Sequence, residues 1–461
     1  MIGKTSWFVP LFLGATLAVS PSWGQSPASV PVPPPPASGG MGSDLSQVAA
    51  LEDLILLAER NNPGLRAAHH RWRGALEKIP QVTSLEDPEL TYMEYLERTM
   101  EPQEELSVMQ MFPYPGKLEL RGRIESAEAE ALRKEMEKRR LDLRAEVKDA
   151  YYEYYYLEQT IRITAESLDL LKHFESVAAA RYGVDKGGSQ DVVKAQVELG
   201  KVEIDLRDLE DSRAPVGARL NAAMNRPTTS PLPPPTEIDL REAALETDKV
   251  LEIAFQANPE LQGLDARIRK AVDQVNLAKK DYYPDFSFGL NWMNGNRKED
   301  VPDEYVAMFR INLPVYRKRL AAGVREAESG VREAQSMREE ARNELAVELQ
   351  SELYRLRNAE RQVRLLSEVL LPKARQSVEV TETGYSAGES TFLELVDTER
   401  ELLAFQENYY RAAASYGQAL AKIEALVGRS LVESNARPLV GSAPSAAPLS
   451  APEEAPLEES Q

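Results

Sequence analysis

The sequence predicts a mainly α-helical fold with a small β part, built from a duplicated half-domain. Three observations predict it. Apolar residues recur with a seven-residue repeat over long stretches without proline. Shorter segments between these stretches alternate apolar and polar residues, as strands do. Marker residues of the first half of the chain also reappear about 200 residues later, a period too long for a solenoid and typical of a duplication.

Composition excludes several classes of function. The 461 residues carry a formal net charge of −19, which argues against a nucleic-acid-binding protein because such proteins need a basic face. The chain has no cysteine, so disulfides, thiolate metal sites and cysteine nucleophiles are excluded. It contains no nucleotide-binding glycine loop, nucleophile elbow or zinc motif. We therefore predict no enzyme, and no catalytic, cofactor-binding or metal-binding residues.

The N-terminus resembles an export signal. Lys4 precedes an apolar stretch, residues 7–20, and small residues follow at positions that a signal peptidase reads. We expect a signal peptide at residues 1–24 and a flexible Pro/Ser/Gly leader at 25–44; a retained N-terminal anchor is the alternative. No later run approaches the roughly 20 apolar residues of a spanning helix. If the mature protein enters a membrane, it therefore does so as β-structure.

The chain divides into two matching halves. Residues 45–225 form the first half, 226–240 a proline-rich connector, 241–430 the second half, and 431–461 an expected disordered tail. The sequence Asn62-Pro63-x-Leu65 recurs as Asn258-Pro259-x-Leu261, 196 residues later. Four other pairs recur at offsets that rise from 196 to 203: Pro88 and Pro284, Pro113 and Pro314, Tyr152 and Tyr354, and Tyr182 and Tyr385.

Each half contains helices of unusual length. Residues 123–182 include neither glycine nor proline, and as one helix they would span about 90 Å. The apolar positions within this stretch alternate in spacing between four and three residues: Leu143, Val147, Ala150, Tyr154, Leu157, Ile161, Thr164, Leu168 and Leu171. This pattern is typical of left-handed coiled-coil packing and recurs in three further segments. We expect two antiparallel helix pairs that reverse at the turns 183–188 and around Gly388.

The segments that precede the long helices predict β-hairpins at about residues 86–113 and 284–314. In the second, Phe286, Phe288, Leu290 and Trp292 face one way and polar residues face the other. Strands of about 9–11 residues suit a transmembrane barrel. Four strands cannot close a barrel, so a membrane location would require an oligomer. The alternative is a soluble hairpin packed on the helices.

The order of these elements resembles the outer-membrane efflux protein (TolC-type) family over roughly residues 45–430. The resemblance is carried by the Asn-Pro-x-Leu repeats, by the strand-to-helix joints at 112–117 and 313–316, and by the helix-turn segments at 181–193 and 384–397. Residues 80–88 and 113–118 resemble the heavy-metal (CusC/CzcC-like) branch of the family.

The resemblance implies a homotrimer with a 12-stranded barrel in the cell outer membrane and an α-helical tunnel in the periplasm. It implies a passive exit duct of a tripartite efflux system, for metal cations or small toxic compounds. The partners would be a periplasmic adaptor (membrane fusion) protein and an inner-membrane pump of the resistance-nodulation-division type. Two alternatives remain open: a structural periplasmic coiled-coil or adaptor protein, and an outer-membrane duct for type I protein secretion, which a neighbouring pump gene would distinguish.

The resemblance also implies where the pore closes. Asp191 and Tyr385 match positions that bridge neighbouring helices in the closed state, although Ser390 stands where the family often has arginine. Glu394 and Asp397 match acidic rings at the pore constriction, where three copies of each would favour cations. The alternative for these two acids is ordinary negative charge at the start of a helix.

Four methionines surround the first predicted hairpin: Met93, Met100, Met109 and Met111. We interpret them as packing or lipid-facing side chains. The alternative is a set of thioether ligands for monovalent copper or silver.

Overall fold

Helices and one four-stranded sheet make up the part of the chain described in the computed structural model. This part comprises residues 50–95, 104–184, 188–238, 240–243, 246–294, 302–431 and 439. The expected signal peptide and leader lie outside the described residues, as does the tail apart from residues 431 and 439. Among the helices of the described ranges, none is both long enough and apolar enough to cross a membrane.

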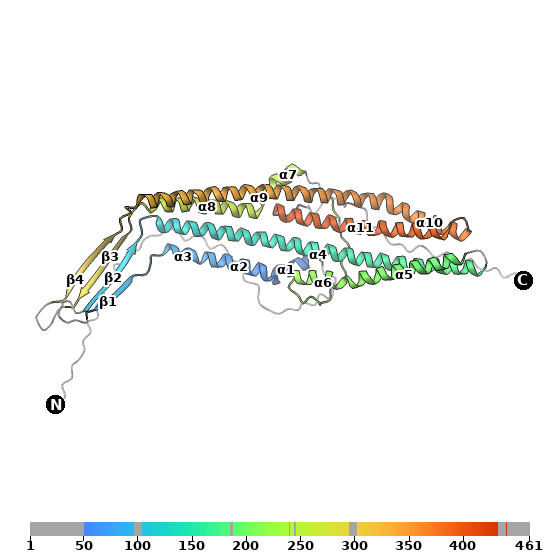
Figure 1. The fold of residues 1–461 in the computed structure, drawn as a ribbon, viewed down its shortest axis with the longest axis horizontal. Helices are drawn as coiled ribbons and strands as arrows, with labels where there is room; N and C mark the ends of the chain where they lie inside the picture. The colour runs from blue at the N-terminus through green and yellow to red at the C-terminus, as the bar shows by residue number, and fades with distance from the viewer. Residues whose placement is uncertain are drawn as a thin grey trace, which may run out of the picture. The chain divides into compact units, whose positions relative to one another are not determined.

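The elements occur in the same order twice (Figure 1). The first set is α1 (Leu51–Asn61), α2 (Pro63–Leu76), α3 (Lys78–Thr83), β1 (Glu89–Glu94), β2 (Glu104–Phe112), α4 (Lys117–Gly183), α5 (Ser189–Asp211) and α6 (Arg213–Ala223). The second is α7 (Thr247–Ala257), α8 (Pro259–Lys280), β3 (Phe286–Met293), β4 (Glu304–Ile311), α9 (Arg317–Leu365), a π-helical segment η1 (Leu366–Leu370), α10 (Leu371–Ala387) and α11 (Phe392–Val427). The prediction of a mainly helical, duplicated fold with a small β part is confirmed.

The two Asn-Pro-x-Leu motifs begin a helix in the same way. Asn62 and Asn258 are N-caps, and each side-chain Oδ1 accepts a hydrogen bond at 3.0 Å from the N–H of the leucine three residues on. The proline that follows lies in the first turn, where its missing N–H has no cost. Each Nδ2 also donates to a carbonyl at the end of the last helix of its set, Ala223 in α6 and Leu426 in α11. The motif therefore joins two segments far apart in the sequence.

The chain leaves α6 and α11 through a residue with positive φ. These residues are Asn225 (φ 55°) and Gly428 (φ 87°). A Cβ at Gly428 would lie 2.8 Å from the carbonyl oxygen of Ala257, so that position requires glycine. At the equivalent joint Asn225 donates from its side chain to the carbonyl of Asn61, at 3.2 Å. Asparagine tolerates this backbone conformation better than most side chains. The same joint is thus made with two different residues.

The long helices pack through the predicted apolar seams. The α4 seam from Leu143 to Leu171 is buried throughout. In the second set, α9 and α10 together correspond to α4, but they are separated by η1. Pro372, just inside α10, has no N–H to donate to the carbonyl four residues earlier. The hydrogen-bond ladder widens immediately before it, where the Leu371 N–H bonds the Leu366 carbonyl.

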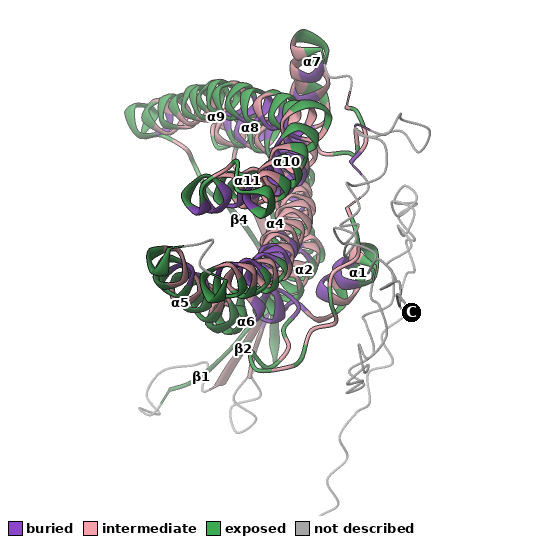
Figure 2. Cartoon of the chain, turned by 90° about the vertical axis from the view of Figure 1, so that its right-hand side faces the viewer, coloured by how far each residue is buried: buried purple, intermediate pink, exposed green. Residues whose placement is uncertain are grey.

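Neighbouring helices bury their facing sides and leave much of the remaining surface exposed (Figure 2). Helix α4 packs against α5, α8 and α11, and α9 packs against α8 and α11. The pairs α4/α5 and α10/α11 are each antiparallel and joined by a short turn, as predicted (Figure 1). Two apolar clusters form the core, the larger spanning both sets of elements and the smaller joining α1, α4 and α6.

A buried lysine connects the sheet to the helices. Gly116 adopts φ 90° and lets the chain turn from β2 into α4. Lys117, which is 5% exposed, then pairs with Asp285 just before β3 at 3.0 Å, and with Asp281 at 3.1 Å. Asp285 also accepts a hydrogen bond at 2.7 Å from the backbone N–H of Tyr114. The strand-to-helix joint between β2 and α4 is therefore held by the helix-to-strand joint between α8 and β3.

The four strands form one antiparallel sheet in the order β1-β2-β3-β4. Its register places the predicted apolar residues on one face. These are Leu90 and Tyr92 of β1, Leu106, Val108 and Phe112 of β2, Phe286, Phe288, Leu290 and Trp292 of β3, and Tyr305, Ala307, Phe309 and Ile311 of β4. Strands β1 and β4 each have one neighbour in this sheet, so each has one edge without a strand partner among the described residues.

Candidate functional site

The helix turns opposite the sheet bring the predicted gate residues to one place. Helix α10 ends at Ala387 and is followed by Gly388 (φ 86°), and the carbonyl of Gly384 accepts hydrogen bonds from the N–H groups of residues 389 and 390. This is the left-handed C-terminal turn that glycine favours. Thr391 then caps α11, so the reversal occupies very few residues. In the first set α4 ends at Gly183 and α5 begins at Ser189; residues 185–187 of that turn lie outside the described residues.

Asp191 and Tyr385 lie together. The Tyr385 ring is 3% exposed and packs edge-on against Phe392, with 5.6 Å between ring centroids. The Arg181 guanidinium lies over its other side, 4.6 Å from the centroid. Burial raises the pKa of the Tyr385 hydroxyl, the Asp191 carboxylate beside it raises it further, and Arg181 opposes both. The cluster therefore links the end of α4 and the start of α5 to the turn between α10 and α11.

Ser390 occupies the place where the resemblance predicts arginine. Its backbone N–H donates to the carbonyl of Gly384, and its side chain packs so closely that a Cβ on Gly384 would lie 2.5 Å from the Ser390 Oγ. A large side chain on residue 384 would therefore displace Ser390. The positive charge beside Tyr385 comes from α4 instead, through Arg181.

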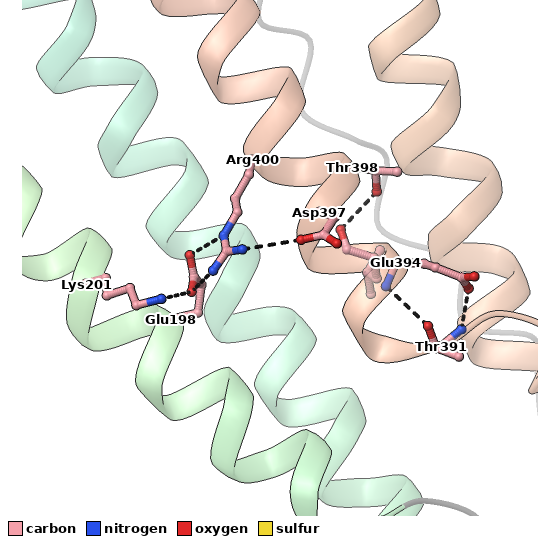
Figure 3. Close-up of polar contacts among 8 residues, drawn as sticks. Glu198, Lys201, Thr391, Glu394, Asp397, Thr398 and Arg400 are labelled. Atoms are coloured by element: carbon pink, nitrogen blue, oxygen red, sulfur yellow. Dashed lines mark hydrogen bonds and ion pairs between the residues drawn. The ribbon is translucent and has the colours of Figure 1, made fainter.

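Glu394 and Asp397 lie near each other on α11 but have different partners (Figure 3). Glu394 completes a capping box: its carboxylate accepts from the Thr391 N–H at 2.8 Å, and its own N–H donates to the Thr391 hydroxyl at 3.3 Å. Asp397 is 58% exposed and pairs with Arg400 at 3.3 Å. Glu394 thus caps the start of α11 and remains exposed to solvent.

A second link between the two helix pairs was not predicted. Glu198 of α5 is 7% exposed and accepts two hydrogen bonds from Arg400 of α11, one of them at 2.6 Å from Nε (Figure 3). Lys201, one turn further along α5, donates to the same carboxylate at 3.2 Å. The Arg400 hydrogen bond lowers the pKa of Glu198, so this carboxylate stays ionised. Arg400 also pairs with Asp397, so a four-residue network joins α5 to α11.

Glu399, next to Arg400 in sequence, faces the other way. Its side chain is 4% exposed and lies against Ser167 of α4, with Glu382 of α10 nearby. Burial raises the pKa of Glu399 to about 7, a hydrogen bond with Ser167 lowers it, and the charge of Glu382 raises it. Glu382 in turn lies 3.5 Å from His173. The group therefore titrates near neutral pH within the helix packing.

Sequence reasoning found part of this site. It placed Asp191 and Tyr385 together, and the structure brings them together. It did not find Arg181, Glu198, Arg400 or Glu399. The only local signal was the spacing of Asp397 and Arg400, which lie three residues apart and so on one helix face. Glu198 and Arg400 are 202 residues apart, and no local pattern pairs them.

The sheet offers a surface of a different kind. Its apolar face is solvent-exposed in the single chain: Leu90 is 68% exposed, Tyr305 66% and Phe288 55%. None of the described helices covers it. An exposed apolar face with two open strand edges is typical of an interaction surface.

A groove in the described part of the chain runs between α4, α9 and α11. Its volume is about 840 Å³, and acids and bases line much of it, including Asp142, Glu352 and Lys422. Burial raises the pKa of Asp142 and of Glu352. The groove contacts α4 at residues 138–149, roughly 50 Å of helix from the turn after Gly183. Its charged lining suits hydrated ions better than apolar ligands.

Comparison with known proteins identifies the class. The family model described as "Outer membrane efflux protein" matches residues 54–226 and 250–429. Both sets of helices and strands fall in these ranges, apart from the first three residues of α1 and of α7, and the chain belongs to this family. Its members are channels of the outer membrane and not enzymes, which confirms the predicted location and class.

Individual relatives extend over nearly the whole chain. The cobalt-zinc-cadmium resistance protein CzcC of Cupriavidus metallidurans is 23% identical over 439 residues, covering 92% of this chain and 99% of that protein. Among solved structures, the match with CusC covers 89% of this chain and 100% of the CusC chain, with a TM-score of 0.70 and 16% identity. The outer-membrane channel OprN covers 83% and 90%, with a TM-score of 0.70 and 17% identity. The structural likenesses support the fold, and the resemblance to the family is confirmed.

Proposed function

We propose that the protein is the passive exit duct of a tripartite efflux system, working as a homotrimer in the outer membrane. The observation that carries this proposal is the sheet: one face is apolar and exposed, and both edge strands have a free edge. In lipid each unpaired backbone group costs several kcal/mol, so only a closed cylinder of strands is stable there. Pairing β1 of one copy with β4 of the next closes such a cylinder, and three copies supply twelve strands.

The helices support the tunnel part of the proposal. Helix α4 has 67 residues, about 100 Å of continuous helix. Apolar side chains remain exposed along α5, where Val193, Val197 and Ile204 are each more than half exposed at helical spacing. On α9, Val347 and Tyr354 form a similar exposed stripe. These stripes suit contact between neighbouring copies, which would extend the coiled-coil packing around the tunnel.

The partners we propose are a periplasmic adaptor of the membrane fusion type and an inner-membrane pump of the resistance-nodulation-division type. The turns at the ends of α4 and α10 are the surface that would meet the adaptor. The duct itself has no energy source of its own in this proposal, and the pump drives transport.

We propose metal cations as the leading cargo, with small toxic compounds second. Two observations favour cations. The relative CzcC is named for cobalt, zinc and cadmium resistance. Exposed carboxylates, including Glu394 and Asp397, cluster at the start of α11, where three copies would raise the local cation concentration.

We also propose a gate at the helix turns, held closed by contacts between the α4/α5 pair and the α10/α11 pair. The closed state is held within each copy by two contacts between the helix pairs: Asp191 and Arg181 around Tyr385, and Glu198 with Arg400. Opening would separate the α10/α11 pair from the α4/α5 pair and break both.

Planar-bilayer recordings of the detergent-purified protein test the duct and its acidic ring together. We expect stable channel currents that multivalent cations block. Glu394→Gln with Asp397→Asn should weaken the block several-fold, because the charge is lost while the glutamine can still accept the capping hydrogen bond. Glu401→Gln, an exposed acid further along the same helix, is the control. Unchanged block in the double variant refutes the acidic ring, and absence of any current refutes the duct.

A further inference from the structure

Five of the eleven methionines of the chain share the polar face of the sheet. The register places Met93, Met109, Met111, Met293 and Met308 there. Within the described strands, no methionine lies on the apolar face, where a packing or lipid-facing side chain would be expected. The interpretation of Met93, Met109 and Met111 as lipid-facing therefore does not fit their placement; Met100 lies outside the described residues.

A glycine draws two of these methionines together. In the register Met109 of β2 and Met308 of β4 flank Gly289 of β3. A Cβ on Gly289 would lie 3.4 Å from the terminal methyl carbon of each, so both side chains lean over the glycine from opposite sides. Their two thioether ends thus meet above a residue without a side chain. Methionine has three rotatable bonds, so small changes can turn both sulfur atoms toward one point.

A buried amide oxygen without a partner lies next to this pair. Asn291 follows Gly289 on the same face of β3 and is 6% exposed. Its Nδ2 donates to a carboxylate oxygen of Glu105 at 2.6 Å, which fixes the orientation of the amide. The other amide atom, Oδ1, is buried and makes no hydrogen bond. A buried acceptor without a partner is costly to the fold unless a ligand fills its place.

We propose that Met109, Met308 and the Asn291 Oδ1 form a binding site for a soft monovalent cation, Ag⁺ or Cu⁺. Neutral thioethers prefer soft ions and are poor ligands for hard divalent ions. The Glu105 carboxylate, hydrogen-bonded to Asn291, supplies a nearby negative charge for the bound cation. In the register, Glu105 of β2 lies between Met93 of β1 and Met293 of β3. These two methionines extend the thioether surface along the polar face.

The inference rests on the proposed function in one respect: the polar face lines the channel only if the sheet closes into a trimeric cylinder. In that case the site lies on the path of the cargo, and it narrows the proposed metal cations to include soft monovalent ones. The ligand set itself lies within one chain.

Silver nitrate in chloride-free buffer is the probe, because Ag⁺ needs no reductant to stay monovalent. The protein is the detergent-purified full chain, labelled with ¹³C at the methionine methyl groups. Titration should shift the methyl resonances of Met109 and Met308, while those of Met136 in α4 and Met337 in α9 stay in place. By calorimetry, Met109→Leu with Met308→Leu should weaken Ag⁺ binding at least about tenfold. Leucine nearly conserves the volume of methionine, so the sheet should keep its packing.

Met136→Leu with Met337→Leu is the matched control and should bind Ag⁺ like the parent chain. Equal Ag⁺ affinity in the Met109/Met308 variant, or Zn²⁺ competing for the same methyl shifts, would overturn the site. Bilayer currents recorded from the same preparations separate the two proposals. Currents without Ag⁺ binding would refute the thioether site but not the duct. Ag⁺ binding without currents would refute the duct but not the thioether site.

Discussion

Glu399 is the residue whose burial has the clearest chemical consequence. Its carboxyl group lies between Ser167 and Glu382, and burial raises its pKa to about 7 from 4.5. The folded protein therefore favours the protonated acid. The resulting stability is complete below about pH 4.5 and is lost as the pH rises through about 7.

A glutamine at this position should remove that dependence. We expect the stability of the parent chain to fall by up to about 3 kcal/mol relative to Glu399→Gln between pH 5 and pH 8. Thermal unfolding midpoints of both proteins at the two pH values provide the measurement. Glu401→Gln, on an exposed face, is the control; a constant difference between parent and Glu399→Gln would contradict the prediction.

Asn258 shows how one side chain can serve two distant backbone segments. Its Oδ1 caps α8 and its Nδ2 holds the Leu426 carbonyl at 2.8 Å, with only 6% of the residue exposed. Asn258→Ala removes both bonds, and we expect a loss of about 2–3 kcal/mol. Asn258→Ser can restore the cap but not the bond to α11, and should recover part of the loss. Asn343→Ala, at an exposed helical position, should leave the unfolding midpoint unchanged. Equal midpoints for the alanine and serine variants would show that the bond to α11 contributes nothing.

At the scale of helices and strands, the spacing of apolar residues predicted the elements whose packing depends on residues close together in the sequence. The seven-residue spacing gave the long helices and their buried seams, because each seam lies within one helix. The hairpin around residues 284–314 was predicted from clean alternation. The break at η1 was not predicted, because Pro372 lies in an otherwise unbroken apolar repeat. Neither was the Glu198–Arg400 link, since both residues look like ordinary surface charges until the helices pack. The face that the methionines occupy became clear only with the strand register.

The link between α5 and α11 makes a prediction about helix movement. Arg400→Ala should release α11 from α5 and raise the open-channel current several-fold, because a buried carboxylate loses the cation that joins it to the other helix pair. Lys201→Ala is the matched control: it removes a cation from the same carboxylate, but one that belongs to α5 itself. Conductance in planar bilayers measures both. Equal currents from the two variants would mean that Arg400 does not hold the gate.

For the whole molecule, the free edges of β1 and β4 determine how copies assemble. The chain has no cysteine, so introduced thiols react without background. Thr91→Cys on β1 with Val306→Cys on β4 should cross-link into dimers and trimers through a flexible bis-maleimide, whose length covers the register shift that barrel closure needs. Ser107→Cys with Ser287→Cys, on the two inner strands, should link only within one chain. Mass on a denaturing gel gives the result, and a monomer-only pattern for Thr91/Val306 would contradict the trimeric cylinder.

The π-helical segment before Pro372 has a mechanical meaning. The two long helices of the chain occupy equivalent positions in their sets. One is uninterrupted from Lys117 to Gly183, whereas the other is interrupted by the π-helical segment Leu366–Leu370. The interrupted helix can bend at its π-helical segment, whereas the uninterrupted helix α4 resists bending along its whole length. In a pore lined by alternating helices of these two kinds, only the helices with the π-helical segment would bend outward during dilation, while the uninterrupted helices keep their position.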